Sequence, residues 1–403
     1  MIFSLELLQA KQGDCLLLHY GSPQQENIII IDGGPGRHFN TYRETLKPRL
    51  KQIKDKLSPN EPLPISMTMI SHMDDDHAAG ILRMLQDIES DVEDNIPPYI
   101  DIKHLWFNTF DDIIGNIEIP QIADLSSGAA IATIAAQIPG LANMEEHTAA
   151  VIASTRQGRI IRDLANKLTI PVNSPFPEMG ANKPPMVRAD VGSNTIEWDP
   201  GLRIQVLHPN FNRLQEMQQK WDTDLKKAHA NNDPDIIFAS IASRDKSPFT
   251  LASIVCLVEF HGKRILLTGD SRDDDILQGL EEANLLDSNG QILVDILKIP
   301  HHGSDRNASR HFFERVQARH YVISGDGSHH NPDKSTLVML SMATRGRNDF
   351  TIHMSNEEGK NDLEQILHEF IEDDRARGRT YGFEFREKHK SSKTIDLLQQ
   401  IDY

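Results

Sequence analysis

The chain has few cysteines and no long apolar segment. Only two of its 403 residues are cysteine, and both Cys15 and Cys256 lie within apolar runs typical of strands. This excludes a disulfide-stabilised scaffold and predicts two buried free thiols in a reducing cytoplasm. No stretch approaches the roughly 20 apolar residues that cross a bilayer, and the amino terminus lacks a basic region followed by an apolar core. We therefore expect a cytoplasmic protein without a membrane segment.

The densest chemical feature is a run of metal-ligand side chains at residues 71–77, which read Ser-His-Met-Asp-Asp-Asp-His. The apolar residues 65–70 predict a short buried strand, and residues 78–88 predict a helix, so the run lies on the turn at the carboxyl end of a strand. Open α/β sheets place their chemistry at such ends. The alternative is a charged loop in which solvent neutralises three adjacent aspartates.

Polar side chains follow four further apolar runs, at the point where each run ends. A lone aspartate in such a place is usually a helix cap or turn residue. Five strand ends with the same kind of chemistry instead favour one shared site. The four runs are residues 27–31 before Asp32, 264–268 before Asp270, 295–300 before His301 and His302, and 321–324 before the segment 325–330.

Together these motifs resemble the metallo-β-lactamase superfamily, and within it the hydrolase domain of the ComEC competence proteins. The resemblance implies an αββα four-layer sandwich, in which two mixed sheets face each other with helices outside, and a metal site along one sheet edge. Periodicity alone indicates only an α/β fold. The matching segments are Gly-Asp-Cys-Leu-Leu at 13–17, Ile-Asp-Gly-Gly at 31–34, residues 71–77, Leu-Leu-Thr-Gly-Asp at 266–270, Leu-Lys-Ile-Pro-His-His-Gly-Ser at 297–304 and Ile-Ser-Gly-Asp-Gly at 323–327.

The resemblance also implies two divalent metal ions, zinc or manganese, and assigns their ligands. His72 and Asp74 would bind one ion, Asp76 and His77 would bind the other, and Asp270 would bridge both. The late histidine of the family would complete the second ion's set of ligands. That histidine corresponds to His329, with His330 as an immediate competitor.

Two departures from the superfamily pattern affect the metal. Asp74 stands where the superfamily has a second histidine. A carboxylate ligand favours manganese or magnesium, but the remaining nitrogen ligands also allow zinc. The superfamily also places a histidine just before the strand that corresponds to residues 253–259, and residues 247–252 contain none. His208 could lie nearby, but we do not assign it as a ligand. The first ion is therefore expected to be weakly held, or to bind only with substrate.

Catalytic roles follow from the same resemblance. Two ions about 4 Å apart generate hydroxide near neutral pH and clamp the oxygens of an in-line displacement. Asp76 would orient that hydroxide, while His302 and Ser304 would contact the leaving group or a phosphate oxygen. Asp32, His301 and His330 would lie outside the ligands and support them. His301 could instead point into the core.

The motifs run from residue 32 to residue 330, which predicts one catalytic domain over residues 1–403. A mostly helical insertion is expected at about 108–209, near the mouth of the site. Residues 212–230 predict another amphipathic helix, whose apolar side indicates core packing. About residues 334–403 are predicted to form an extension of helices and a strand.

Three functions remain open from sequence. The leading prediction is a metal-dependent phosphodiesterase or nuclease. The formal net charge of −17 opposes non-specific binding of long DNA, which favours short, single-stranded or small-molecule phosphodiester substrates. Two basic segments, 43–56 and 375–393, could touch a phosphate backbone, although a solvated surface is the favoured interpretation. The alternatives are a hydrolase of a lactone, thioester or β-lactam, and a non-catalytic regulatory protein that binds metal.

Overall fold

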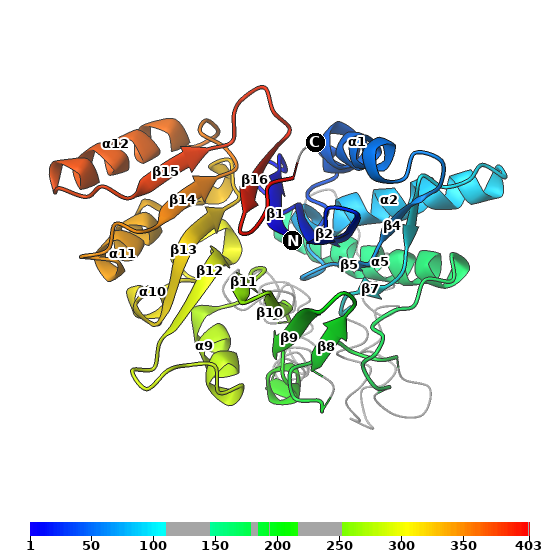
Figure 1. The fold of residues 1–403 in the computed structure, drawn as a ribbon, viewed down its shortest axis with the longest axis horizontal. Helices are drawn as coiled ribbons and strands as arrows, with labels where there is room; N and C mark the ends of the chain where they lie inside the picture. Colours follow the sequence, from blue (N-terminus) through cyan, green and yellow to red (C-terminus); the bar gives the residue numbers. More distant parts are fainter. Residues whose placement is uncertain (110–145, 179–183, 193, 217–251, 402) are drawn as a thin grey trace, which may run out of the picture.

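The computed structural model describes residues 1–109, 146–178, 184–192, 194–216, 252–401 and 403. It has a mixed α/β fold with several sheets, as predicted (Figure 1). The first sheet consists, in order across the sheet, of β16 (Ser392–Asp396), β1 (Ile2–Leu8), β2 (Leu16–Ser22), β3 (Gln25–Ile31), β5 (Met67–Met69) and β7 (Leu105–Trp106). A separate pair is formed by β4 (Leu63–Ile65) and β6 (Ile100–Ile102).

The second sheet is larger and mixed. Its order is β15 (Gly382–Phe385), β14 (Thr351–Met354), β13 (Val316–Ile323), β12 (Ile292–Lys298), β11 (Lys263–Leu267), β10 (Val255–Phe260), β9 (Leu202–His208) and β8 (Thr195–Trp198). From β11 to β15 each strand is parallel to the next, and β3 is parallel to β5 in the first sheet. Because parallel strands point the same way, the segments that leave their carboxyl ends meet at one edge.

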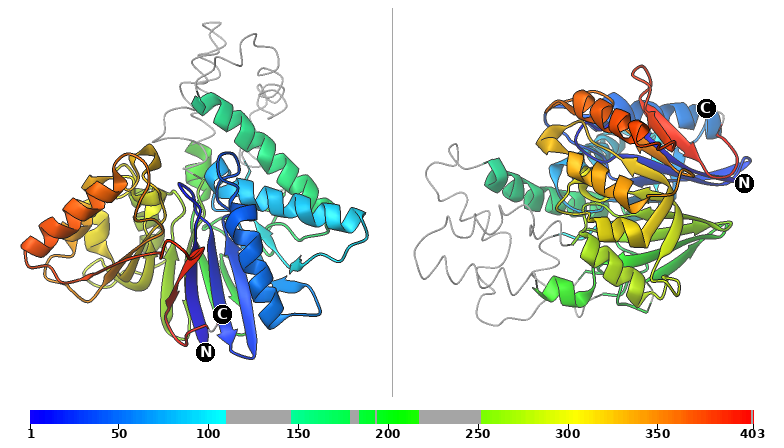
Figure 2. Two further views of the ribbon diagram at one scale, coloured as in Figure 1. Left: turned by 90° about the horizontal axis from the view of Figure 1, so that it is seen from above. Right: turned by 90° about the vertical axis from the view of Figure 1, so that its left-hand side faces the viewer.

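Helices lie on the outer side of each sheet (Figure 2). One apolar core joins the first sheet to α1 (Lys47–Leu57), α2 (Asp75–Glu93) and α5 (Glu146–Lys167). Another joins the second sheet to α9 (Asp273–Glu282), α10 (Arg310–Arg315), α11 (Lys334–Ala343) and α12 (Leu363–Ala376). A third lies between the sheets, where Leu5 and Ile29 of one meet Val258 and Ile296 of the other. Each sheet thus buries both of its faces.

The five strands predicted to carry the site are all present, as β3, β5, β11, β12 and β13. The helix predicted at 78–88 is confirmed within α2. The predicted insertion contains the helix α5, and the predicted C-terminal extension contains α11 and α12. Residues 110–145 of the insertion lie outside the described residues, as does most of the helix predicted at 212–230. Cys15 and Cys256 are buried free thiols, as predicted. None of the described helices is long and apolar enough to span a membrane.

A buried network of charged side chains ties β1 to β2, β3 and α1. The fully buried carboxylate of Glu6 contacts His19 Nε2 at 3.1 Å and accepts from Arg49 Nε at 2.7 Å, and His19 Nδ1 lies 2.7 Å from Glu26 Oε1. Burial opposes ionisation of Glu6, but His19 and Arg49 outweigh it and lower the pKa of Glu6 to about 2. Burial also opposes a charge on His19, but Glu26 and Glu6 outweigh it and raise the pKa of His19.

These two shifts predict that the free energy of unfolding is largest at mildly acidic pH. The lowered pKa of Glu6 contributes of the order of 3 kcal/mol, present in full above the usual value of 4.5 and lost as the pH falls toward about 2. The raised pKa of His19 contributes in full below 6.5 and is lost as the pH rises through its value in the folded protein. Urea unfolding of the wild type and of His19→Gln across this range measures both. A wild-type alkaline decline no steeper than that of the variant would contradict the shift of His19.

Candidate metal centre

The site is assembled at the edge where parallel strands of both sheets end. Asp32 follows β3, and the segment 71–77 follows β5 and leads into α2. Asp270 follows β11, and His301 with His302 forms a short helical turn after β12. Both of these histidines adopt left-handed backbone angles, with φ of 47° and 54°, and the N–H of His301 donates to the carbonyl oxygen of Gly269 at 3.1 Å. This turn therefore lies directly beside Asp270.

Four histidines surround the carboxylate of Asp270, which is almost fully buried. Nε2 of His77 and Nε2 of His302 lie 3.4 and 3.7 Å from Asp270 Oδ1. Nε2 of His72 and Nε2 of His301 lie 3.6 and 3.5 Å from Asp270 Oδ2. The two oxygens of one carboxylate thus face two separate pairs of imidazoles.

Each pair of imidazoles has a further carboxylate beside it. Asp74 Oδ2 is 3.6 Å from His72 Nε2, while Asp76 is 3.9 Å from His77 Nε2 through Oδ1 and 3.5 Å from His302 Nε2 through Oδ2. We call His72, Asp74, His301 and Oδ2 of Asp270 the first group. We call Asp76, His77, His302 and Oδ1 of Asp270 the second group.

The opposite nitrogen of every ring, Nδ1, is held by an oxygen from outside the two groups. A neutral ring whose Nδ1 donates a hydrogen bond carries its lone pair on Nε2, so all four lone pairs are directed toward Asp270. This is the arrangement in which proteins hold histidine ligands of metals. The four contacts are His77 with Asp32 Oδ2 at 2.9 Å, His302 with the carbonyl oxygen of Ser324 at 3.1 Å, His301 with Asn307 Oδ1 at 2.8 Å and His72 with Ser71 Oγ at 3.2 Å.

The residues of both groups fit a metal ion. His72 Nε2 and Asp270 Oδ1 are buried without a hydrogen-bond partner, a costly state for polar atoms. A tetrahedral ion with bonds of about 2.0–2.1 Å keeps its ligand atoms roughly 3.3 Å apart. In the first group His72 Nε2 lies 3.6 Å from Asp74 Oδ2 and from Asp270 Oδ2, and His301 Nε2 lies 3.5 Å from Asp270 Oδ2. In the second group His77 and His302 lie 3.3 Å from each other and 3.4 to 3.9 Å from Asp270 and Asp76.

The electrostatics of the cluster also favour added positive charge. Burial opposes a charged imidazole, but Asp270 and Asp14 outweigh it and raise the pKa of His302 to about 9. The pKa of His77 rises well above its usual value for the same reason, with Asp270 and Asp32 as the largest opposing charges. A divalent cation supplies this positive charge to several carboxylates at once.

Asp14 lies behind the second group. Its Oδ1 is 3.5 Å from His302 Nδ1, and its Oδ2 is 3.9 Å from His77 Nδ1 and 2.6 Å from Lys298 Nζ. Asp14, His77, Asp270 and His302 each offer a ligand atom within 4.8 Å of the others, which is close enough for one ion. Asp14, however, faces the Nδ1 sides of both rings. Asp76 faces the Nε2 sides, so we assign Asp76 to the second group and place Asp14 outside it.

The structure brings together most of the residues that the sequence predicted as ligands. His72, Asp74, Asp76, His77 and Asp270 converge, and Asp270 lies between the other four. Asp32, predicted to orient a ligand, contacts both His77 and Ser71. The predicted division of the residues, His72 with Asp74 and Asp76 with His77, is the division that the two groups display.

The late histidines lie elsewhere. His329 and His330 are exposed on the short turn Ser328–His330, and among the described residues the set close enough for one ion, Asp14, His77, Asp270 and His302, takes its late histidine from the turn after β12. His302, predicted to contact the leaving group, occupies the second group in place of His329. His301, predicted to lie outside the ligands or in the core, completes the first group with a side chain 25% exposed.

Ser304, His208, Asn307, Lys298 and Asp14 are not members of either group. Ser304, predicted to be catalytic, is buried, and its hydroxyl oxygen accepts from the N–H of Arg306 at 3.5 Å. His208 is buried at the end of β9, opposite Val255 of β10. Sequence reasoning gave no role to Asn307 or Lys298, although Lys298 lies within one of the matching motifs. Asp14 also lies in a matching motif, and that motif was the sequence feature from which its place near the site could have been predicted.

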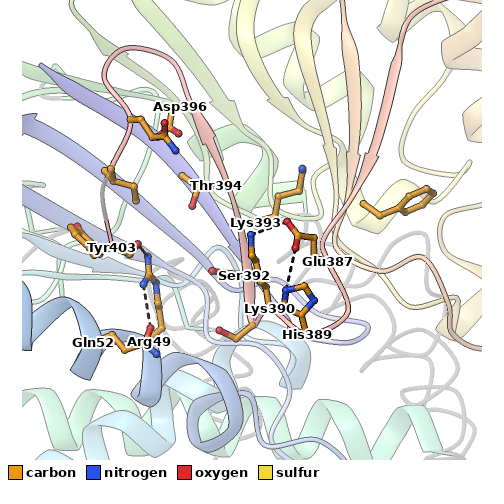
Figure 3. Close-up of a pocket in the computed structure, with 14 residues that line it drawn as sticks. Arg49, Gln52, Glu387, His389, Lys390, Ser392, Lys393, Thr394, Asp396 and Tyr403 are labelled. Atoms are coloured by element: carbon orange, nitrogen blue, oxygen red, sulfur yellow. Dashed lines mark hydrogen bonds and ion pairs between the residues drawn. The ribbon is translucent and has the colours of Figure 1, made fainter.

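A pocket of about 570 Å³ lies beside β16, next to α1 and the last residues of the chain (Figure 3). Its basic side chains include Arg49, Lys390 and Lys393, and each is paired with a carboxylate: Glu6 at 2.7 Å, Glu387 at 2.8 Å and Glu384 at 2.8 Å, respectively. These residues belong to the two basic segments of the sequence. Their pairing favours the interpretation as a balanced surface over a phosphate-binding one.

A comparison of the chain with models of protein families gave no match, and neither did a comparison with curated proteins. The chemistry of the site must therefore be inferred from its own residues.

Proposed function

We propose that the protein is a metal-dependent hydrolase of the metallo-β-lactamase type, and that it cleaves phosphodiesters at a dinuclear centre. In this proposal the two sheets and their outer helices form the αββα sandwich of that superfamily. One observation carries the proposal: each oxygen of Asp270 faces its own pair of imidazole Nε2 atoms, with a further aspartate beside each pair. A shared carboxylate between two such groups is the arrangement expected of a two-metal site.

Two bound divalent ions would supply Lewis-acid activation of water and would offset the charge on a phosphoryl group during in-line displacement. The first group would hold one ion and the second group the other, with Asp270 shared. Each group offers two nitrogens and two oxygens, a set that suits zinc and manganese.

The open side of the centre is the side of its aspartates. The side chains of Asp74 and Asp76 are 37% and 27% exposed, whereas those of His72, His77 and His302 are at most 4% exposed. Substrate and water would therefore approach along Asp74 and Asp76. Asp76, between two imidazoles of the second group, is placed to orient a water molecule and to accept its proton.

A second candidate is a hydrolase of a lactone, thioester or β-lactam. A histidine-rich zinc site would favour it, and the sequence motifs alone did not provide one. In the structure His301 adds a second imidazole to the first group, and this makes the centre richer in histidine than the sequence suggested. The same observation weighs against a non-catalytic protein with a depleted site.

The proposal is tested by metal analysis and a panel of substrates. The purified protein is expected to hold two divalent ions and to hydrolyse an aryl phosphodiester and short single-stranded DNA with manganese or zinc. His72→Ala should abolish this turnover, because it removes an imidazole from the first group. His368→Ala, a change at an exposed histidine on α12, is the control and should retain full turnover.

Other outcomes would decide between the alternatives. Turnover of a chromogenic lactam or ester without phosphodiester turnover would overturn the phosphodiesterase and support the second candidate. Two bound ions without turnover of any substrate in the panel would support a non-catalytic role.

A further inference from the structure

A lysine is buried beneath the second group. Lys298, the last residue of β12, is 1% exposed, and its Nζ lies 2.6 Å from Asp14 Oδ2. Lysine is rarely buried to this extent unless it is paired, because the ammonium group loses its hydration. A protein in which apolar side chains replace such a buried pair is often as stable as the original. The pair therefore calls for an explanation beyond stability.

The partner of Lys298 contacts the second group only from behind. Oδ1 of Asp14 faces Nδ1 of His302 at 3.5 Å and accepts from the hydroxyl of Ser324. Oδ2 of Asp14 faces Nδ1 of His77 at 3.9 Å. In the first group His301 is held by Asn307, while the hydroxyl of Ser71 contacts Nδ1 of both His72 and His77. Within the two groups Asp14 contacts His77 and His302, and Lys298 contacts Asp14, so Lys298 lies behind the second group.

The balance of charge also makes Lys298 part of the centre. Two divalent ions and the ammonium group of Lys298 carry five positive charges. They would balance the five carboxylates that lie in or directly behind the two groups, namely Asp14, Asp32, Asp74, Asp76 and Asp270. Without Lys298, the carboxylate of Asp14 would be left buried and uncompensated beside two imidazoles.

We propose that Lys298 is a positioning residue for the second metal ion: it fixes Asp14 against the Nδ1 atoms of His77 and His302, and so sets the affinity of the second group for its ion without touching it. This inference rests on the proposed dinuclear centre. Partners behind histidine ligands typically change metal affinity by about 10–100-fold, which is the size of effect expected here.

The test measures metal binding in the full chain, with zinc or cobalt alone as the probe. Metal-free wild type is titrated by calorimetry, and the cobalt spectrum reports the ligands of each ion. Lys298→Met is expected to weaken binding at the second group by about 10–100-fold and to leave binding at the first group unchanged. Asn307→Ala is the reciprocal control, because Asn307 holds His301 of the first group. It should weaken binding at the first group and leave the second group's cobalt spectrum unchanged.

A double variant separates positioning from folding. Lys298→Met with Asp14→Leu removes both buried charges, so its stability to urea should approach that of the wild type even if Lys298→Met alone folds poorly. Its second group should still bind its ion weakly, because no carboxylate of residue 14 then faces Nδ1 of His77 and of His302. Recovery of that affinity together with stability would show that the ion pair is only structural, and would overturn the inference.

Failure of the proposed function gives a different result. A wild type that binds fewer than two ions would overturn the dinuclear centre, and with it the role of Lys298. A wild type with two ions whose affinities are unchanged in Lys298→Met would overturn the role of Lys298 alone.

Discussion

Replacement of Asp270 by asparagine is expected to remove both metal ions and to lower hydrolysis by about 10³-fold or more. Asp270 contributes to both groups, since its two oxygens lie 3.4 to 3.7 Å from four different imidazole nitrogens. Loss of a partner behind a ligand already costs about 10–100-fold, and this change acts on a ligand shared by two ions. The amide keeps the shape of the side chain but gives up the charge that two cations would share.

Metal content and turnover of Asp270→Asn are compared with those of Asp295→Asn. Asp295 is also nearly buried in the second sheet, where it accepts from Lys263 Nζ at 3.1 Å and from the N–H of Arg264 at 2.9 Å. None of these partners belongs to the centre. The control should therefore retain both ions and its activity. One ion bound as tightly as before in Asp270→Asn would show that this carboxylate does not bridge.

Replacement of Gly80 by alanine is expected to destabilise the fold by about 3 kcal/mol or more and to weaken the second group. A Cβ atom on Gly80 would lie 1.8 Å from the carbonyl oxygen of Gly33. The two segments are joined there by backbone hydrogen bonds, from Gly80 N–H to Gly34 at 3.0 Å and from Gly33 N–H to His77 at 2.7 Å. Because a backbone atom cannot turn aside as a side chain does, α2 must move away from the loop that carries Asp32.

Urea unfolding and zinc titration measure the two consequences. Gly192→Ala is the matched control, because a Cβ atom there meets no atom within 4 Å. It should leave the free energy of unfolding and the metal affinity as they are. A Gly80→Ala protein with wild-type stability and wild-type zinc affinity would mean that this close approach of α2 and the Asp32 loop is not needed for either.

The sequence was sufficient for the strand ends and for most of the residues that converge at Asp270. Asp32, His72, His77 and Asp270 each follow a short apolar run, and such runs become parallel strands whose carboxyl ends share an edge. Two-residue periodicity could identify the strands but could not distribute them between two sheets. That distribution depends on packing between residues far apart in the chain, such as Leu5 and Val258.

The sequence could not predict which of two pairs of adjacent histidines lies beside Asp270. His301-His302 and His329-His330 each follow a strand of the second sheet, and both pairs adopt left-handed backbone angles. Only the first pair is tied by a hydrogen bond to Gly269, directly before Asp270. Which pair of histidines lies beside Asp270 therefore depends on which loop lies beside β11, and spacing along the chain carries no information on that neighbour.

The outermost strand of the first sheet comes from the far end of the chain. β16 pairs with β1 in register from Ser4 with Asp396 to Leu8 with Ser392, and the hydroxyl of Ser392 also donates to Glu6. During translation, β1 leaves the ribosome nearly 400 residues before its neighbour. The backbone N–H and C=O groups along this side of β1 therefore lack their β16 partners, and are solvated or shielded by a chaperone, until synthesis is almost complete.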